Sequence, residues 1–216
     1  MSDLRTDEEQ AEIIKKWWAE NGASTVTTIL VAAAGVIGWN FWQDSKQATG
    51  EAASATYTRL VELSAQESSA NNTEMQTLAE QLRTEYASTA YADFGTLFVA
   101  RLAADNGDYA AAAAELEALV KEADSDAVKL VAQARLATVL IELGKVDEAL
   151  AALPVQADPA FAPQIEEARG DALFRKGELA GARDAYLKAL DAAQTIGQTN
   201  NTLQRKIDSL NVAEEA

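Results

Sequence analysis

Residues 169–190 read RGDALFRKGELAGARDAYLKAL, and this stretch decides the fold. Apolar residues recur at helical spacing on both sides of Gly177, which predicts two helices joined by a short turn at that glycine. The small residues Gly170 and Ala182 flank the turn, where two antiparallel helices would cross most closely. The stretch therefore predicts a helical hairpin with a tight crossing.

The same arrangement occurs twice earlier in the chain. The turn glycines are Gly107, Gly144 and Gly177, which are 37 and 33 residues apart. A small residue lies seven positions before and five positions after each glycine, and a bulkier residue follows four positions later. These three sets are Ala100, Ala137 and Gly170; Ala112, Ala149 and Ala182; and Leu116, Leu153 and Tyr186. A period in this range indicates repeated helical hairpins, which bury their apolar faces by stacking on their neighbours.

This combination resembles the tetratricopeptide repeat, in which a helix, a turn with Gly and a second helix with Ala at the crossing form one unit. The resemblance implies three repeats, at residues 93–126, 130–162 and 163–196. The first two repeats lack the aromatic residue at the first large position of the first helix. Pro154 also predicts a shortened second helix in the middle repeat.

Stacked repeats need capping helices at both ends of the array. We expect N-terminal caps within residues 44–66 and 73–85, separated by a polar loop at 66–73. The C-terminal cap is expected at residues 202–210. Its apolar face would carry Leu203, Ile207 and Leu210.

A second feature is the run of twenty-three uncharged residues from Asn21 to Gln43. As a helix it would be roughly 35 Å long, which is enough to cross a hydrocarbon core of ~30 Å. Aromatic residues lie near both predicted interfaces, as in membrane-spanning helices. They are Trp17, Trp18, Trp39, Phe41 and Trp42.

Two alternatives to a membrane anchor are a buried core helix and a cleaved signal peptide. The leading segment of about twenty residues is acidic, whereas a signal peptide begins with a short basic region. Small residues at Ala48, Ala52 and Ala53 could resemble a cleavage site, but they lie beyond the tryptophans. An uncleaved signal anchor is favoured.

Basic residues near the span indicate its orientation, because Lys and Arg are enriched on the cytoplasmic side. Arg5, Lys15 and Lys16 precede the span, and Lys46 and Arg59 follow it. This small excess predicts a cytoplasmic N-terminus and an exported C-terminal part.

The expected fold class is all-α: a single N-terminal transmembrane helix, then a tetratricopeptide-repeat-like α-solenoid of about three helix pairs plus capping helices. Five parts are expected along the chain: a cytoplasmic segment at 1–20, a transmembrane signal-anchor helix at 21–43, a linker with N-terminal capping helices at 44–92, the repeats at 93–196, and a C-terminal capping helix and tail at 197–216.

Composition excludes several classes of function. The chain has no His and no Cys, which removes the usual zinc, iron-sulfur and haem ligand sets and every Ser-His or Cys-His dyad. The net charge is −16, from 18 basic and 34 acidic residues, and no basic cluster could neutralise phosphates. No glycine-rich phosphate loop occurs. We therefore expect no cofactor, no nucleic acid and no small-molecule substrate.

Paired carboxylates are the remaining candidates for acid-base chemistry or metal binding. The pairs are Glu115 with Glu117, Asp147 with Glu148, and Glu166 with Glu167. Acidic helix faces produce such pairs without any catalytic role, so we expect no enzyme activity.

A binding module would instead use the concave surface formed by the first helix of each repeat. The repeat positions that project from it hold Phe94, Leu97, Arg101, Val131, Thr138, Ile141, Gln164, Asp171, Phe174 and Arg175. A mixed apolar and basic groove could hold an extended peptide or the tail of a partner. The alternative for Leu97, Ile141 and Phe174 is packing between repeats. For Arg101 and Arg175 the groove is favoured.

The order of features along the whole chain resembles the YfgM family of ancillary SecYEG translocon subunits in bacterial inner membranes. The specific parts are Ala19-Glu-Asn-Gly22 before the span, Gly38-Trp-Asn-Phe-Trp42 at its end and Arg169-Gly-Asp-Ala-Leu173 in the last repeat. The resemblance implies a single-pass protein with a periplasmic repeat domain. It also implies association with the SecYEG translocon and with the membrane-anchored periplasmic chaperone PpiD.

Two functions stay open at this point. One is an interaction subunit that links the export channel to periplasmic chaperones and helps exported proteins fold or reach their destination. The other is a periplasmic scaffold for envelope assembly or cell division.

Overall fold

The computed structural model describes residues 7–66 and 71–214 of the chain. Within these ranges the regular secondary structure is helical, with no strand. The helices are α1 (Asp7–Ala65), α2 (Asn72–Thr84), α3 (Tyr91–Asp105), α4 (Tyr109–Glu122), α5 (Asp126–Glu142), α6 (Val146–Ala152), α7 (Ala162–Lys176), α8 (Leu179–Thr195) and α9 (Asn201–Glu214). The expected all-α class is confirmed.

The chain divides into two compact units, Met1–Glu51 and Ala52–Ala216, with the boundary inside α1. The described part of the first unit is one helix that contains the expected span. Only 6% of the most apolar stretch of this helix is buried. A core helix of a soluble protein would be mostly buried, so this alternative does not fit. The exposed apolar side chains include Val26, Ile29, Leu30, Val31, Val36 and Ile37.

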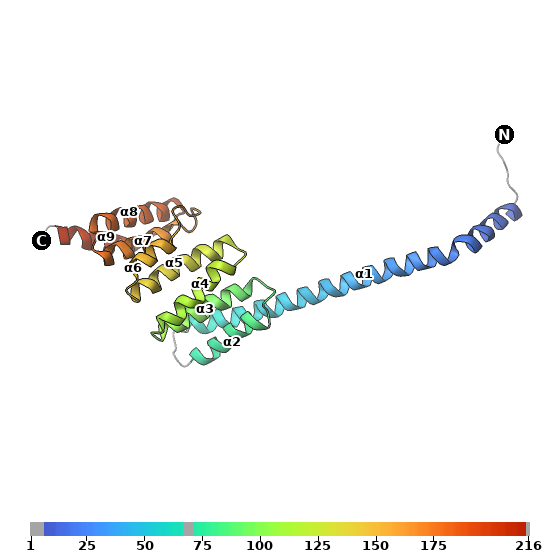
Figure 1. The fold of residues 1–216 in the computed structure, drawn as a ribbon, viewed down its shortest axis with the longest axis horizontal. Helices are drawn as coiled ribbons and strands as arrows, with labels where there is room; N and C mark the ends of the chain where they lie inside the picture. The colour runs from blue at the N-terminus through green and yellow to red at the C-terminus, as the bar shows by residue number, and fades with distance from the viewer. Residues whose placement is uncertain (1–6, 67–70, 215–216) are drawn as a thin grey trace, which may run out of the picture. The chain divides into compact units, whose positions relative to one another are not determined.

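The second unit is a helical solenoid. Its helices from α2 to α9 stack side by side in chain order (Figure 1), and α3–α4, α5–α6 and α7–α8 form three successive hairpins. Helix α5 also packs against both α3 and α7. Helix α6 ends at Ala152, two residues before Pro154, which confirms the expected short helix.

Glycines terminate the first helix of each hairpin. Gly107, Gly144 and Gly177 have φ angles of 81°, 74° and 86°, in the left-handed region that L-residues with a side chain rarely adopt. After Gly177, for example, the amide of Glu178 donates to the Leu173 carbonyl at 2.9 Å, which closes the end of the helix. Gly197 repeats this geometry after α8, with φ 73°, although it lies outside the repeat pattern of the sequence.

The predicted close crossings are confirmed. Ala112, Ala149 and Ala182 are fully buried, at 0% exposure. The bulkier residues that follow each of them are also buried, at 5% exposure or less. Small residues at the crossings therefore let the two helices of each hairpin approach closely, and the larger ones fill the space toward the next helix.

Both ends of the solenoid are covered by helices outside the three hairpins. Leu60 and Leu63, near the end of α1, share a buried cluster with Ala79 and Leu82 of α2. This N-terminal cap is the last part of α1, so no separate helix begins after the span. At the other end, Leu203, Ile207 and Leu210 of α9 are buried against α8, as expected.

Candidate partner-binding groove

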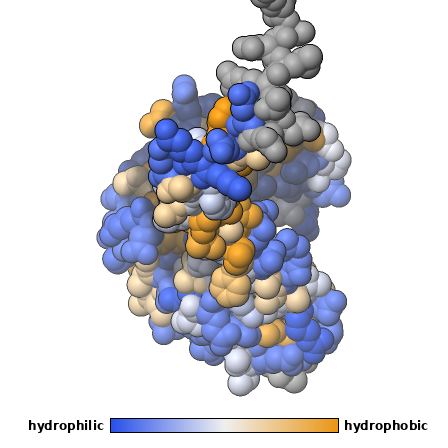
Figure 2. All heavy atoms as spheres, turned by 90° about the vertical axis from the view of Figure 1, so that its right-hand side faces the viewer, coloured by the Kyte–Doolittle hydropathy of each residue, from blue (hydrophilic) through white to orange (hydrophobic). Residues whose placement is uncertain are grey.

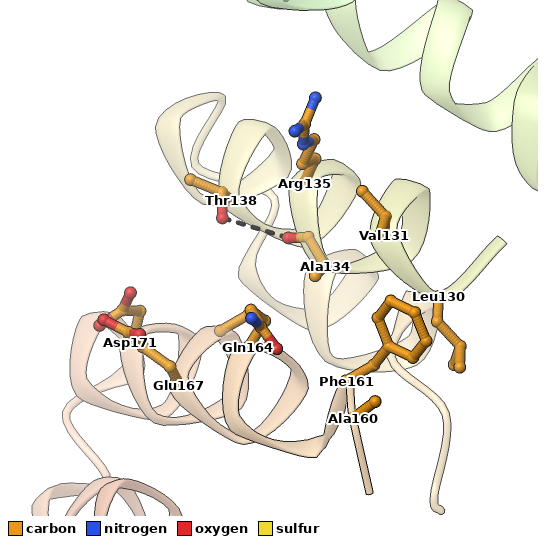
Figure 3. Close-up of a pocket in the computed structure, with 11 residues that line it drawn as sticks. Leu130, Val131, Ala134, Arg135, Thr138, Ala160, Phe161, Gln164, Glu167 and Asp171 are labelled. Atoms are coloured by element: carbon orange, nitrogen blue, oxygen red, sulfur yellow. Dashed lines mark hydrogen bonds between the residues drawn. The ribbon is translucent and has the colours of Figure 1, made fainter. Parts of the chain in front are cut away.

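A pocket of about 430 Å³ lies between α5 and α7, on the first helices of two adjacent hairpins (Figure 3). Its lining residues come from both helices and from the end of the loop before α7. They are Leu130, Val131, Ala134, Arg135, Thr138, Ala160, Phe161, Gln164, Glu167, Ala168 and Asp171. Phe161 and Leu130 lie together at one end of it (Figure 3).

A second pocket, of about 270 Å³, lies between α3 and α5. Its lining is mainly apolar, and it consists of Ala100, Arg101, Ala104, Leu116, Arg135, Thr138 and Val139. Arg135 and Thr138 line both pockets, so the two are neighbours on the face formed by α3, α5 and α7. We call this pair of pockets the groove.

The groove brings together half of the residues that the repeat register selects. Val131, Thr138, Gln164 and Asp171 line the larger pocket, and Arg101 lines the smaller one. Thr138 donates its hydroxyl proton to the Ala134 carbonyl at 3.1 Å, one turn earlier on α5 (Figure 3).

The other selected residues lie elsewhere. Leu97 and Ile141 are both 7% exposed and belong to the hydrophobic core, so for these two the packing alternative holds. Phe94 belongs to an aromatic cluster with Tyr57 and Tyr91, at ring centroid distances of 5.3 and 6.1 Å. Phe174 is 50% exposed.

The two arginines selected from the sequence both have carboxylate partners. Arg101 Nε lies 3.5 Å from Asp105 on the same helix, and Arg175 Nη2 lies 3.5 Å from Glu142 on α5. Each of these four side chains is at least 45% exposed, so solvent screens both pairs. Arg175 lines neither pocket.

Arg135 is a cation of the groove that the repeat positions do not select. Its side chain reaches solvent, yet burial lowers the pKa of the guanidinium, the neighbouring Arg101 lowers it further, and Tyr57 acts in the opposite direction. Arg135 lies four residues after Val131 and three before Thr138, hence on the same face of α5. That helical spacing is the signal in the sequence that could have found it.

At the α7 end of the groove a polar cluster joins three helices. Lys206 Nζ of α9 lies 2.9 Å from Glu167 Oε1 and 2.6 Å from Asp171 Oδ1, and the Tyr186 hydroxyl of α8 donates to the same Asp171 oxygen at 2.7 Å. The Asp171 carboxylate is therefore already occupied within the protein. We call Glu167, Asp171, Tyr186 and Lys206 the α9 latch.

The environment of the latch shifts two pKa values. Burial raises the pKa of the Tyr186 phenol, and its hydrogen bond to Asp171 raises it further. Burial by itself would lower the pKa of Lys206, but the hydrogen bonds to Asp171 and Glu167 outweigh that effect and the pKa is raised. Both groups are therefore held in their protonated forms.

The acidic pairs of the sequence contribute to ion pairs on the helix surfaces. Glu115 pairs with Arg83 of α2 at 3.2 Å, and Glu166 pairs with Arg169 at 3.3 Å. Across residues 7–66 and 71–214, no group of three or more acidic residues is placed to hold a metal ion. The groove offers apolar and basic side chains for recognition, and its carboxylates, Glu167 and Asp171, are already paired with Lys206.

Comparison with known proteins agrees with this architecture. The family model of the tetratricopeptide repeat-like domain matches residues 15–212, which includes the apolar helix as well as the solenoid. A relative from Escherichia coli strain K12 is 25% identical, over 98% of this chain and 100% of its own length.

Two further relatives are similar over most of their length. The one from Haemophilus influenzae is 28% identical over 88% of this chain and 93% of its own, and the one from Neisseria gonorrhoeae is 29% identical over 94% and 97%. All three relatives are named ancillary SecYEG translocon subunit. The chain belongs to the tetratricopeptide repeat-like family that includes these subunits, the YfgM family.

Proposed function

We propose that this protein is a non-enzymatic, membrane-anchored interaction protein that serves as an ancillary subunit of the Sec translocon. The observation that carries the proposal is the end-to-end match with relatives of that name, 98% of this chain against 100% of the Escherichia coli protein. A match of this extent includes both the apolar helix and the solenoid. A shared repeat fold alone would support a much weaker inference.

The first part of α1 has the features of a membrane anchor. Its apolar side chains are exposed. At the C-terminal end of the span, the ring centroids of Trp39 and Trp42 lie 5.1 Å apart. Lys46 Nζ lies 4.2 Å from the centroid of the Trp42 ring. Amphipathic aromatic rings next to a cation are typical of the interface between hydrocarbon and headgroups.

The anchor would lie in the bacterial inner membrane, with the N-terminus in the cytoplasm and the solenoid in the periplasm. Arg5, Lys15 and Lys16 before the span, against Lys46 and Arg59 after it, support this orientation. It would place the groove on the side of the membrane where exported proteins emerge from the channel.

The solenoid would then hold a partner polypeptide beside the channel. The partner that family membership favours is the periplasmic chaperone PpiD, and the resulting activity would be to help exported proteins fold or reach their destination. The groove supports this part of the proposal because it combines apolar pockets with basic side chains on a strongly acidic protein.

Affinity purification of the full chain from detergent-solubilised membranes tests the function. SecYEG subunits should copurify with it, together with PpiD, and an unrelated single-pass protein with the same tag is the control. Recovery of envelope-assembly or division proteins without any SecYEG subunit would favour the scaffold alternative and contradict the proposal.

Cysteine labelling tests the orientation, because the natural chain contains no Cys and a single introduced thiol reports its own side of the membrane. Glu12 in α1 and Ser125 before α5 are both exposed. In spheroplasts, a membrane-impermeant maleimide should label the Ser125→Cys variant at once and the Glu12→Cys variant only after lysis. The opposite pattern would reverse the proposed topology.

A further inference from the structure

Arg135 differs in its surroundings from most of the other basic side chains of the solenoid. Arg59, Arg83, Lys145, Arg169, Lys176 and Lys206 each have a carboxylate oxygen within 3.3 Å. Among the residues that the structure describes, no carboxylate lies within ion-pairing distance of the Arg135 guanidinium. Lys121, Lys188 and Arg205 also lack such a partner within the described part of the chain, but they line neither pocket, whereas Arg135 lines both.

A second cation lies close to Arg135. Arg101 and Arg135 line the same 270 Å³ pocket from α3 and α5, and the proximity of Arg101 disfavours the charge of Arg135. Asp105 pairs with Arg101 at 3.5 Å, but both side chains are more than half exposed, so solvent screens the pair. Two like charges that line one pocket, one of them partly desolvated, form a site that an added anion would stabilise.

The acidic groups of the larger pocket do not complete this site. Figure 3 shows Arg135 extended away from Glu167 and Asp171, which lie on α7 on the other side of the pocket. Lys206 already pairs with both of these carboxylates. The carboxylates of α7 and the two arginines of α3 and α5 therefore lie in different parts of the groove.

The surroundings of the two arginines indicate the class of ligand. Ala104, Leu116 and Val139 give the smaller pocket an apolar floor, and Val131 and Phe161 do the same for the larger one. A nucleic acid or another dense polyanion would be repelled by a chain of net charge −16. A peptide with one or two carboxylates beside apolar side chains matches both the charge and the pockets.

Resting on the proposed function of the groove, we propose that Arg101 and Arg135 bind a carboxylate of an extended acidic peptide of the partner, whose neighbouring apolar side chains enter the two flanking pockets. The carboxylate would lie between α3 and α5, in bidentate contact with at least one guanidinium, since that geometry matches the planar fork of arginine.

Selection from a peptide library tests the ligand class, because it requires no knowledge of the partner's sequence. The full chain, purified in detergent, is immobilised and used to select from a library of random linear peptides at physiological ionic strength. We expect enrichment of Asp or Glu at one position, flanked by apolar residues. Failure to enrich any peptide, enrichment without an acidic position, or binding only to anionic lipid vesicles would overturn the proposal.

Paired substitutions then locate the carboxylate. For a selected peptide, Arg135→Gln and Arg101→Gln should each raise Kd about tenfold or more, and Arg135→Lys should restore only part of the loss. Replacing the peptide's acidic residue by its amide should remove the difference between wild type and Arg135→Gln. Unchanged Kd in both arginine variants would overturn the site.

Arg175→Gln is the matched control, because Arg175 is an exposed arginine on α7 that pairs with Glu142 and lines neither pocket. Its peptide affinity should equal that of the wild type. The Sec proposal is judged separately, since copurification of SecYEG subunits with the Arg101 and Arg135 variants would show that the translocon contact survives when peptide capture is lost.

Discussion

The Tyr186 ring of α8 lies directly against Gly170 of α7, and its hydroxyl donates a hydrogen bond to Asp171, the next residue of α7, at 2.7 Å. A Cβ at position 170 would overlap the ring carbons, so the ring occupies the space that a side chain would need. The same Asp171 oxygen contacts Lys206 of α9. One aromatic side chain thus joins the last hairpin to its cap.

Gly170→Ala should therefore destabilise the solenoid. Alanine favours a helix by about 1 kcal/mol over glycine, but displacing a packed ring typically costs about 1–3 kcal/mol and here also disturbs a hydrogen bond. Thermal unfolding of the full chain in detergent, followed by circular dichroism, measures the difference.

Gly181→Ala is the matched control for this substitution. Gly181 lies in α8, and a Cβ there would meet Leu173 at 3.4 Å, which is ordinary van der Waals contact. Its melting temperature should equal or exceed that of the wild type. Equal melting temperatures for the Gly170 and Gly181 variants would contradict the close packing of Tyr186 on Gly170.

Ala149→Trp should overpack the middle hairpin. Ala149 is 0% exposed at the crossing of α5 and the short α6, and a close-packed crossing cannot accept an indole unless the helices move. We expect a loss of about 1–3 kcal/mol or more in unfolding free energy, measured by denaturant titration. Ala151→Trp, at an exposed position of the same helix, should unfold close to the wild type.

The solenoid itself could be predicted from the sequence because its determinants are local. A left-handed turn needs Gly107, Gly144 or Gly177, and a close crossing needs a small residue at a fixed distance from it. Gly197 performs the same role but follows the last repeat, outside the period that revealed the others.

The groove could be predicted only in part, because repeat positions fix the face of a helix and not the depth of a side chain. Val131 and Thr138 line the larger pocket, whereas Leu97 turns into the core between the helices. The pairing of Lys206 with Asp171 joins residues 35 positions apart. No local spacing encodes such a contact, since it depends on how α9 packs on the last hairpin.

The α9 latch predicts a loss of stability at alkaline pH. The pKa values of Tyr186 and Lys206 are raised above their ordinary values of 10.0 and 10.5, so the folded state holds these two protons more tightly than the unfolded state. Their contribution is complete below about pH 10 and is lost as the pH rises toward the raised values. The double variant Tyr186→Phe with Lys206→Met should show a shallower decline in melting temperature above about pH 10.

The control for the latch is Lys188→Met, which removes an exposed cation from α8 and leaves the latch intact. Its melting temperature should decline with pH as steeply as that of the wild type. If the double variant declines just as steeply, the latch does not carry the alkaline dependence.

Crosslinking from the groove should identify the partner and its location. Figure 2 shows one face of the protein, which is mostly hydrophilic and has an apolar region near its centre. An apolar region on a hydrophilic surface is a typical contact site for another polypeptide. Thr138 lines both pockets, and a photoreactive residue there should trap a partner polypeptide in living cells. The same probe at Ala151, exposed on α6 and outside both pockets, should trap little.

Arg135→Gln, combined with the probe at Thr138, should then reduce the yield of the crosslinked partner. Equal yields at positions 138 and 151, or crosslinks confined to probes within residues 21–43, would place the contact outside the groove.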